Sequence, residues 1–565
     1  MVTKIETWAY QGYPKSKTMS REVQLSFFDG TKSNEISVED SAFAAGVSPA
    51  TIKNWIKTGY LVPIGKRMIK LDSLDQFKKE IAGKDKLNKR ANKSLKDSHD
   101  HNEVTSTFLE KIAKCTGNCD YIGTEYESRL SDAYRNKEGI FYTPDNIINE
   151  LFKIDILNLD IATFCDPCCG SGNFVMKALS LGFKPENIYA FDTDPVAVEL
   201  TKKRIFEKTC YKSNNIINED FLLFEKNHRN RKFNYIFTNP PWGKKIERRE
   251  REIIAKRLGA GSSIDTCSLF FFACLNALLD NGKLGLLLPE AFFNISSHED
   301  ARICALKYEI EKLIDFDKPF ISLMTKAQAI ILSKRKSTSE KFVICEYNKN
   351  SSERTILSFS KNPKSILNLH CSHDDANTIA YIFSINHITL KSRAKWGLGI
   401  VTGSNNKFIH KKPGNGLIPV FKGSDITKNG LLKPSCYIPY DMSLYQQVAP
   451  IEFYESDEKL IYRFISSRLC FIHDTLRRFV LNSANILIPN DDFPVSMRVL
   501  CELLNSDFMN WMFSKIFNTH KILRSDLEYL PIHYQFLKGE RFIEDDFINN
   551  LGIERSNNGA FRIKK

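Results

Sequence analysis

Between about residues 104 and 340, short apolar runs alternate with longer segments whose apolar residues recur every three or four positions. This alternation predicts strands joined by helices, and therefore a parallel sheet wound with helices on both faces. The helices expected between the strands include Pro195–Thr209 and Asp265–Asp280. The expected strands are Ile161–Cys165, Asn187–Asp192, Asn214–Asn218, Phe233–Asn239, Gly282–Pro289, Glu309–Phe316 and Ala327–Ser333.

The first 83 residues have a different pattern, with a polar start followed by a compact unit over about residues 36–82. We expect a helix over Ser37–Ala45, a turn at Gly46, and a second helix capped by Ser48. A short hairpin over Tyr60–Lys70 would follow. The unit resembles the small winged helix-turn-helix of excisionases and of regulators of the mercury-resistance type. A helical hairpin used only for packing or dimerisation is the alternative.

The core of this small unit should consist of the apolar residues of the two helices and the turn, namely Ala44, Val47, Ile52, Trp55 and Ile56. Residues 84–103 are rich in basic side chains and predict a linker. Residues 104–340 would form the catalytic domain. Beyond residue 340 the alternation fades, and aromatic-rich, mixed α+β segments predict a separate binding domain over residues 341–565.

Composition narrows the class of protein. Hydrophobic residues make up 42% and charged residues 26% of the 565 residues, which is typical of a globular protein. The net charge of +13 suits a polyanionic partner, although a merely basic enzyme would carry it too. The 14 cysteines show no paired zinc spacing, so we expect free thiols and no metal site. No secretion signal and no apolar run of about 18 residues is present, which favours a cytoplasmic protein without membrane contact.

Acidic residues follow three successive predicted strands. The first strand leads into the glycine-rich turn Asp166–Phe174, where Gly170 and Gly172 permit tight curvature and close approach of a cofactor. Asp192 ends the second strand, where a carboxylate can bind ribose hydroxyls. Asp220 follows the third strand and can accept a hydrogen bond from an adenine amine. Each acid can alternatively cap the helix that follows it.

The most informative segment is Asn239-Pro-Pro-Trp242, directly after a predicted strand. The side-chain oxygen of Asn239 and the carbonyl of Pro240 can both accept hydrogen bonds from an exocyclic amine. Proline has a fixed φ, so the acceptors sit on a stiff turn, and Trp242 offers a face for base stacking. Together with the glycine-rich turn, this segment predicts methyl transfer to the amino group of a base.

The ordered motifs resemble those of S-adenosylmethionine-dependent amino-methyltransferases acting on DNA. These motifs are Gly139–Pro144, Asp166–Phe174, Phe191–Asp194, Asn218–Phe221 and Asn239–Trp242. The order, with a long domain after the catalytic one, resembles the gamma arrangement of DNA N6-adenine methyltransferases of type II restriction-modification systems. One departure is Cys168-Cys169, where a small residue more often precedes the cysteine.

The resemblance implies a Rossmann-like fold and a role for each matching residue. It places Thr143 and Pro144 beside the methionine part of the cofactor, with Asp166 near the ammonium. It places Asp192 at the ribose hydroxyls and Asp220 at the adenine amine, with Phe221 beside the ring. The other implied cofactor-binding residues are Tyr142, Pro167, Gly170 and Gly172. For binding of the flipped adenine it implies Asn239, Pro240, Pro241 and Trp242, with Phe320 as a second stacking residue.

The implied partners are double-stranded DNA with a specific short site and a cognate restriction endonuclease. Three alternatives stay open at the sequence level. N4-cytosine methylation would use the same acceptors, and methylation of a protein glutamine presents a similar amide to the Asn-Pro-Pro motif. A regulator that binds DNA through the helix-turn-helix belongs to a different class.

Overall fold

The structure is a computed structural model of the whole chain, which folds as two units, Met1–Glu103 and Val104–Lys565. It describes residues 35–45, 52–53, 55–56, 61–64, 68–80, 104–117, 119–130, 143–243, 246–320, 325–338, 340–348, 350–428, 430–537, 539–557 and 559–564. The basic linker predicted over residues 84–103 lies outside these ranges. Among the described residues, no helix is both long and apolar enough to cross a membrane.

The described residues of the first unit form a three-stranded sheet and two helices of three or more residues. Its elements are β1 (Glu35–Ser37), α1 (Val38–Ala44), β2 (Pro63–Ile64), β3 (Met68–Lys70) and α3 (Leu71–Glu80). Strand β3 pairs antiparallel with both β1 and β2, so a hairpin lies within the predicted Tyr60–Lys70 segment. Gly46–Ser48 and much of the predicted second helix lie outside the described residues.

The core of the first unit differs from the prediction at one described position. Ile52 and Trp55 are buried as expected, but Ala44 is exposed. The buried positions of α1 are Val38 and Ala42, four residues apart and therefore on one face of the helix. Ala44 lies off that face. Val47 lies outside the described residues.

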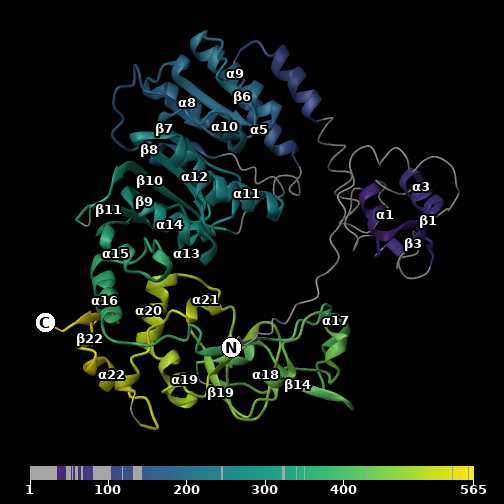
Figure 1. Cartoon of the computed structure of the whole chain (residues 1–565), viewed down its shortest axis with the longest axis vertical. Helices are drawn as coiled ribbons and strands as arrows, with labels where there is room; N and C mark the ends of the chain where they lie inside the picture. The colour runs from purple at the N-terminus through teal and green to yellow at the C-terminus, as the bar shows by residue number, and fades with distance from the viewer. Residues whose placement is uncertain are drawn as a thin grey trace, which may run out of the picture. The chain divides into compact units, whose positions relative to one another are not determined.

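The second unit is built on a nine-stranded sheet in the order β12-β11-β9-β10-β8-β7-β4-β5-β6 (Figure 1). Strands β6, β5, β4, β7 and β8 run parallel, whereas β10 runs antiparallel to its neighbours β8 and β9. The bounds are β4 (Phe164–Asp166), β5 (Ile188–Asp192), β6 (Ile216–Asn218), β7 (Phe233–Thr238), β8 (Leu278–Pro289), β9 (Tyr308–Asp315), β10 (Ala327–Lys336), β11 (Phe342–Tyr347) and β12 (Asn350–Thr355).

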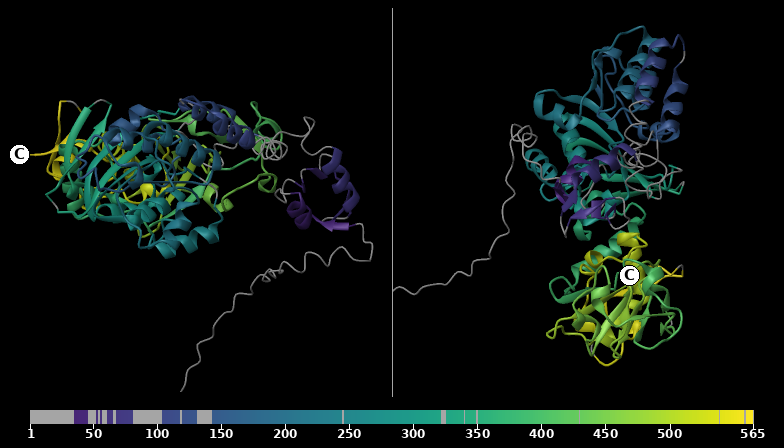
Figure 2. Two further views of the ribbon diagram at one scale, coloured as in Figure 1. Left: turned by 90° about the horizontal axis from the view of Figure 1, so that it is seen from above. Right: turned by 90° about the vertical axis from the view of Figure 1, so that its right-hand side faces the viewer.

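Helices lie on both faces of this sheet (Figures 1 and 2). Helix α8 contacts both α7 and α9, whereas α12 contacts α10, α11 and α14. The bounds are α5 (Asp120–Arg129), α7 (Asp145–Leu151), α8 (Asn173–Leu181), α9 (Pro195–Thr209), α10 (Phe221–Asn227), α11 (Arg248–Leu258), α12 (Thr266–Ala277), α13 (Ala291–Asn294), α14 (Glu299–Ala305), α15 (Ile356–Ser360) and α16 (His373–Ser384). The parallel, doubly wound part of the prediction is confirmed.

The sheet does not end at residue 340, where we expected the catalytic domain to end. Strand β11 pairs in parallel with β9, and β12 pairs with β11, so the sheet runs on to Thr355. These two strands carry exposed and polar positions, and the apolar alternation on which the boundary was based is therefore weak.

The C-terminal part of the second unit contains two small sheets and short helices, green to yellow in Figure 2. The sheets have the orders β13-β21-β18-β19 and β17-β14-β20. Their bounds are β13 (Ala394–Leu398), β14 (Leu417–Phe421), β17 (Cys436–Pro439), β18 (Lys459–Arg463), β19 (Phe471–Asp474), β20 (Phe479–Val480) and β21 (Ala484–Pro489). Two-stranded pairs are β15 (Ile426–Thr427) with β16 (Gly430–Leu431), and β22 (Ile553–Arg555) with β23 (Phe561–Ile563). The helices are α17 (Asn405–Phe408), α18 (Ile451–Tyr454), α19 (Met497–Asn505), α20 (Asp507–Phe517), α21 (Arg524–Leu527) and α22 (Glu544–Asn550).

Candidate active site

The chain reverses direction across the sheet between β4 and β7. From β4 it proceeds outward through β5 to β6, and it then returns to the other side of β4 as β7. Ligands of open α/β sheets bind at the carboxyl ends of the strands at such a switch point. Asp166 ends β4, Asp192 ends β5 and Asn239 follows β7, so all three lie at this edge.

The glycine-rich turn after β4 has the backbone conformation that its sequence predicts. Gly170 and Gly172 have φ values of 49° and 86°, in the left-handed region that favours glycine. A Cβ atom on Gly172 would lie 2.7 Å from Oγ1 of Thr201, so a larger residue does not fit. The Gly170 amide donates to Oδ2 of Asp192 at 2.8 Å. The turn and the second acidic residue are thus held together.

Asp166 is a buried carboxyl group with an open acceptor. Its side chain is 0% exposed, and Oδ1 accepts a hydrogen bond from the Cys168 amide at 3.2 Å. Burial raises the pKa of Asp166 to about 7, against the opposing effect of a hydrogen bond from the Thr238 side chain, which lowers the pKa. Beyond Thr238, Oδ2 has no partner among the described residues. In its ionised form, a buried carboxylate of this kind fits a cationic group of a ligand, such as the ammonium of S-adenosylmethionine.

The later acidic residues differ in which backbone amides they bind. Asp194 caps α9 by accepting from the Val196 amide at 2.9 Å, and Asp220 caps α10 by accepting from the Leu222 amide at 2.9 Å. Asp192 instead accepts from Gly170 and, at 2.9 Å, from the Asp194 amide. It therefore braces the glycine-rich turn rather than a helix.

The other residues expected to bind the cofactor differ in burial and packing. Phe221 is 1% exposed and packs on Phe191, with the ring centroids 5.2 Å apart. Pro167 is buried next to Asp166, and Pro144 precedes α7 in an extended conformation. Tyr142 lies outside the described residues.

Thr143 connects the glycine-rich motif to the Asn-Pro-Pro-Trp loop. Its carbonyl accepts a hydrogen bond from Nδ2 of Asn173, in the glycine-rich turn, at 3.1 Å. Its hydroxyl accepts from Nδ2 of Asn239 at 3.2 Å. Thr143 is 96 residues from Asn239 in sequence and only 5% exposed, so this contact fixes the two motifs relative to each other.

The aromatic residues of the loop lie where the sequence places them, but edge to face. Trp242 and Phe320 are 9% and 8% exposed, and their ring centroids are 5.6 Å apart at an interplanar angle of 87°. Nε1 of Trp242 donates to the Leu287 carbonyl of β8 at 3.3 Å. Pro240 is buried, and the Pro241 carbonyl accepts from the Cys267 thiol at 3.9 Å. The predicted pair of rings is thus brought together in the structure.

Sequence reasoning missed three residues that support this site. Asn173 lies within the glycine-rich motif, and this position is the signal that marks it. Arg204 on α9 donates to Oδ1 of Asn173 at 2.9 Å and to the Ser171 carbonyl at 2.6 Å. Its Nε also pairs with Asp120 of α5 at 2.8 Å. Nothing local in the sequence marks Arg204 or Cys267, because their partners are distant in the chain.

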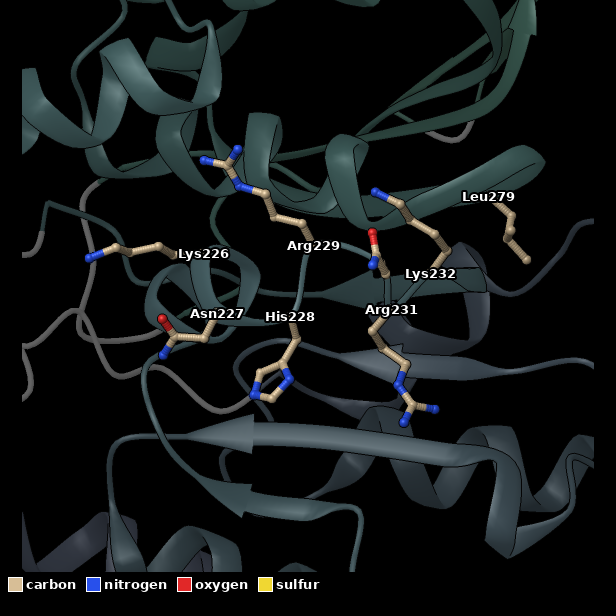
Figure 3. A pocket seen from close by; sticks show the side chains of 8 residues that line it. Lys226, Asn227, His228, Arg229, Arg231, Lys232 and Leu279 are labelled. Carbon is tan, nitrogen blue, oxygen red and sulfur yellow. The ribbon is translucent and has the colours of Figure 1, made fainter.

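A surface pocket lies at the opposite edge of the sheet, at the amino ends of β7 and β8 (Figure 3). It is formed by the loop Lys226–Lys232 and by Leu279. The loop is strongly basic, but the side chains of Arg229 and Arg231 point in opposite directions in this view. Asn239 lies at the carboxyl end of β7, so this pocket is separate from the residues at the switch point.

The side chains and the glycine turn at the carboxyl edge of the sheet fit one kind of cofactor and one kind of substrate group. Strand-end carboxylates, a tight glycine turn and a buried open acceptor suit a nucleoside with a cationic amino-acid tail. The adjoining Asn239 and Pro240 suit an amine. Fold and site together define a Rossmann-like methyltransferase of the S-adenosylmethionine-dependent class.

Comparison with known proteins agrees with that class. The N-6 DNA Methylase family profile matches residues 117–393, and the profile of the TaqI-like C-terminal specificity domain matches residues 418–532. The Type II methyltransferase M.VspI of Vibrio sp. (strain 343) is 45% identical over 407 residues, which are 72% of this chain and 100% of that protein. Modification methylase CviBIII of Paramecium bursaria Chlorella virus NC1A is 25% identical over 39% of this chain and 56% of its own length.

The chain belongs to the N-6 DNA methylase family, as a site-specific DNA methyltransferase that uses S-adenosylmethionine and carries a C-terminal specificity domain. The N4-cytosine alternative is not favoured. The fold is also that of the type IIL restriction-modification enzyme MmeI, solved in complex with DNA. That structure has a TM-score of 0.51 and 13% identity, and the match covers 75% of this chain and 72% of that one.

Proposed function

We propose that the protein methylates the N6 amine of one adenine in a specific site of double-stranded DNA, using the residues at the carboxyl ends of β4 and β7. The observation that carries this proposal is the contact between Asn239 Nδ2 and Thr143 Oγ1 at 3.2 Å. Because the amide nitrogen is directed to Thr143, the amide oxygen is the end of Asn239 that faces an incoming amine. The substrate amine is thereby held beside the cofactor motif.

The chemistry of the amine assigns the roles of Asn239 and Pro240. The N6 nitrogen of adenine is conjugated with the ring and is a poor nucleophile. Two acceptors, Oδ1 of Asn239 and the Pro240 carbonyl, draw its two hydrogens out of the ring plane and localise the lone pair. S-adenosylmethionine, when bound, supplies the electrophilic methyl group. Positioning contributes much of the rate, and the methylated amine then loses a proton without a strong general base.

The strand-end residues of the chain would hold the cofactor. Asp166 pairs with the ammonium, and Thr143 and Pro144, preceded by Tyr142, flank the methionine part. Asp192 binds the ribose hydroxyls. Asp220 accepts from the adenine amine beside Phe221, with the carboxyl oxygen that does not cap α10.

The target adenine must leave the double helix to reach Asn239. Flipping a base costs a few kcal/mol, and base–aromatic stacking returns roughly 1–3 kcal/mol per base. Trp242 provides this stacking face, and Phe320, packed edge-on against it, closes the other side of the base pocket. The two rings pack against each other, so a base bound between them would replace part of this ring–ring contact.

Substitution of Asn239 tests these assignments. We expect Asn239→Ala to lower the methylation rate by roughly 10²–10³-fold or more, by analogy with loss of one preorganised hydrogen-bonding group. Cofactor affinity, measured by calorimetry, should not change. Asn215→Ala is a matched control, since Asn215 lies at the amino end of β6, and it should leave both quantities as in the wild type. Loss of cofactor affinity in Asn239→Ala would contradict the assignment.

The product is read most directly from DNA. A mixed-sequence plasmid is incubated with the protein and S-adenosylmethionine and then sequenced as single molecules, base by base. We expect N6-methyladenine at one short motif. N4-methylcytosine would overturn the choice of base, and an unmodified plasmid despite cofactor binding would overturn DNA as the substrate.

We further propose that this methylation protects cytoplasmic DNA of a bacterial or archaeal cell from a cognate restriction endonuclease. Support comes from the relative M.VspI, which is named a type II methyltransferase. DNA methylated by the protein should resist one endonuclease that cuts the same motif. Cleavage of fully methylated DNA by every endonuclease of that specificity would contradict the proposal.

A further inference from the structure

One segment joins the catalytic sheet to the C-terminal domain, and we call it the junction turn (Asn362–Cys371). On the catalytic side, the Leu367 amide donates to the Phe293 carbonyl at 2.9 Å. On the C-terminal side, Nδ2 of Asn368 donates to the Lys515 carbonyl at 2.8 Å. The junction turn is thus bonded to both domains within two consecutive residues.

A buried ion pair lies at the centre of this junction. Nζ of Lys364 is 3.0 Å from Oδ1 of Asp526 in α21, and the two side chains are 1% and 5% exposed. The ammonium also lies 5.0 Å from the ring centroid of Tyr529 and 5.9 Å from that of Phe517. Lys364 therefore contacts three residues of the C-terminal domain through one side chain.

The backbone of Lys364 is held from the other side by Arg302 of α14. Its carbonyl accepts from Nε of Arg302 at 3.3 Å and from Nη2 at 3.0 Å. The Arg302 side chain is 0% exposed, and Nη1 donates to the carbonyls of Phe292 and Ile295 at 2.8 and 2.7 Å. A continuous chain of buried polar contacts thus runs from the catalytic sheet through Lys364 to α21.

A second buried arginine reinforces the same turn. Nη1 of Arg354, at the end of the sheet in β12, donates to the carbonyl and to Oδ1 of Asn368, at 2.8 and 3.0 Å. It also reaches the Cys371 carbonyl at 3.3 Å. Arg354 is 0% exposed. Asn368, which bonds Lys515, is therefore fixed from the catalytic side.

Buried ion pairs rarely add net stability over apolar residues of the same size, because desolvation offsets the attraction. They do impose one geometry, since each charge is costly unless its partner is in place. Asn239 directly follows β7 of the sheet, and the specificity domain contains α21. If the specificity domain binds the DNA site, the angle between these two parts would set which base reaches the amine acceptors.

We propose that Lys364 and Asp526, braced by Arg302, are positioning residues that set the register between the recognised DNA site and the methylated base. This inference rests on the proposed function. It predicts that the ion pair determines sequence discrimination rather than folding or cofactor binding.

The test is the double variant Lys364→Met/Asp526→Asn, which removes both charges and keeps similar side-chain volumes. We expect a melting temperature and a cofactor Kd equal to those of the wild type. The ratio of kcat/KM for the wild-type motif to kcat/KM for duplexes with one altered base pair should fall at least tenfold. A purely structural role would lower the melting temperature without changing that ratio.

A matched control is Lys312→Met/Glu346→Gln. This pair, 2.8 Å apart, joins β9 to β11 within the catalytic sheet and does not cross the junction. Its discrimination ratio should be that of the wild type. If the Met/Asn variant does not fold, Lys364→Gln/Asp526→Asn, which retains a neutral hydrogen bond, is measured in the same way.

The outcomes separate the two proposals. A wild-type protein that methylates no DNA motif refutes the proposed function itself. A wild-type protein with one clear motif, and a folded double variant with the same discrimination ratio, refutes only the role of the ion pair. An equal fall of the discrimination ratio in the control variant also contradicts the role of the ion pair, because loss of any buried ion pair would then lower discrimination.

Discussion

At the scale of single residues, Asp166 combines a buried carboxyl group with a shifted protonation equilibrium. Its pKa is about 7, against an ordinary value of 3.8, because burial disfavours the charged form. In the free protein, the stability contributed by the neutral form is present below pH 3.8 and is lost as the pH rises through about 7. A cationic ligand reverses this preference, since it needs the ionised carboxylate. Cofactor binding therefore competes with a proton.

We predict that the affinity for S-adenosylmethionine rises with pH up to about 7 and then levels off. Below that value, the ligand must displace one proton, and Kd should fall about tenfold per pH unit. Calorimetry in two buffers of different ionisation enthalpy measures the released proton directly. In Asp166→Asn the pH dependence should vanish and binding should be weaker throughout. A slope that persists in this variant would assign the proton to another group.

At the scale of elements, helix α8 has a left-handed glycine at each end, and the two have different surroundings. Gly172 precedes the helix with φ 86°, and an added Cβ would lie 2.7 Å from Thr201 Oγ1. Gly182 follows it with φ 105°, and the nearest atom to an added Cβ is Cδ1 of Leu159 at 3.7 Å. Replacement by alanine therefore tests backbone strain alone at Gly182, and backbone strain together with a steric clash at Gly172.

We expect Gly182→Ala to lower the free energy of unfolding by about 1–2 kcal/mol, the cost of a left-handed alanine, with cofactor affinity unchanged. Gly172→Ala should cost more and should also weaken cofactor binding, because the turn must move away from α9. Denaturant unfolding and calorimetry on the two variants provide the comparison. Equal effects on cofactor binding would show that the turn is not the cofactor cradle.

Elements with a strong local pattern could be predicted from sequence. Helix α9 has the predicted bounds, since Asp194 caps it and Pro195 begins it. The predicted Asp265–Asp280 helix was too long. Helix α12 ends at Ala277 because Leu278 already pairs with Phe233 of β7. This helix is apolar on all sides, so no change of periodicity marks its end.

The motifs of the site could also be read from sequence, but not the contacts that hold them. Asp166 and Asp192 end strands, Asp220 and Asn239 come just after strands, and the parallel order brings them to one edge. The bond between Thr143 and Asn239 spans 96 residues, and the ion pair between Lys364 and Asp526 spans 162. Pairings at such separations depend on the tertiary fold, which no local pattern encodes.

At the scale of the whole molecule, the chain divides at Glu103/Val104, and each unit has its own hydrophobic core. The relative M.VspI is matched over its full length by 72% of this chain, so more than a quarter of the chain has no counterpart there. Both family profiles lie within the second unit, and we therefore propose that the first unit is not needed for methyl transfer. We further propose, from its resemblance to a helix-turn-helix, that the first unit binds the promoter of its own operon.

We predict that a protein beginning at Val104 methylates its motif with the kcat and KM of the full chain. Binding to its own promoter, measured by electrophoretic mobility shift, should be lost in the truncated protein. A fall in methylation at every site would instead assign the first unit to substrate binding. Unchanged promoter binding would remove the case for a regulatory role.

The junction turn has a consequence for exchanging specificities between relatives. A C-terminal domain transplanted from another methyltransferase brings its own residue to the position of Asp526, while Lys364 stays with the recipient. If that residue is neutral, a buried ammonium is left without its counter-ion, and the chimaera loses its register although both halves fold. Grafts of this kind should therefore carry the junction turn together with α21, as one transferable cassette.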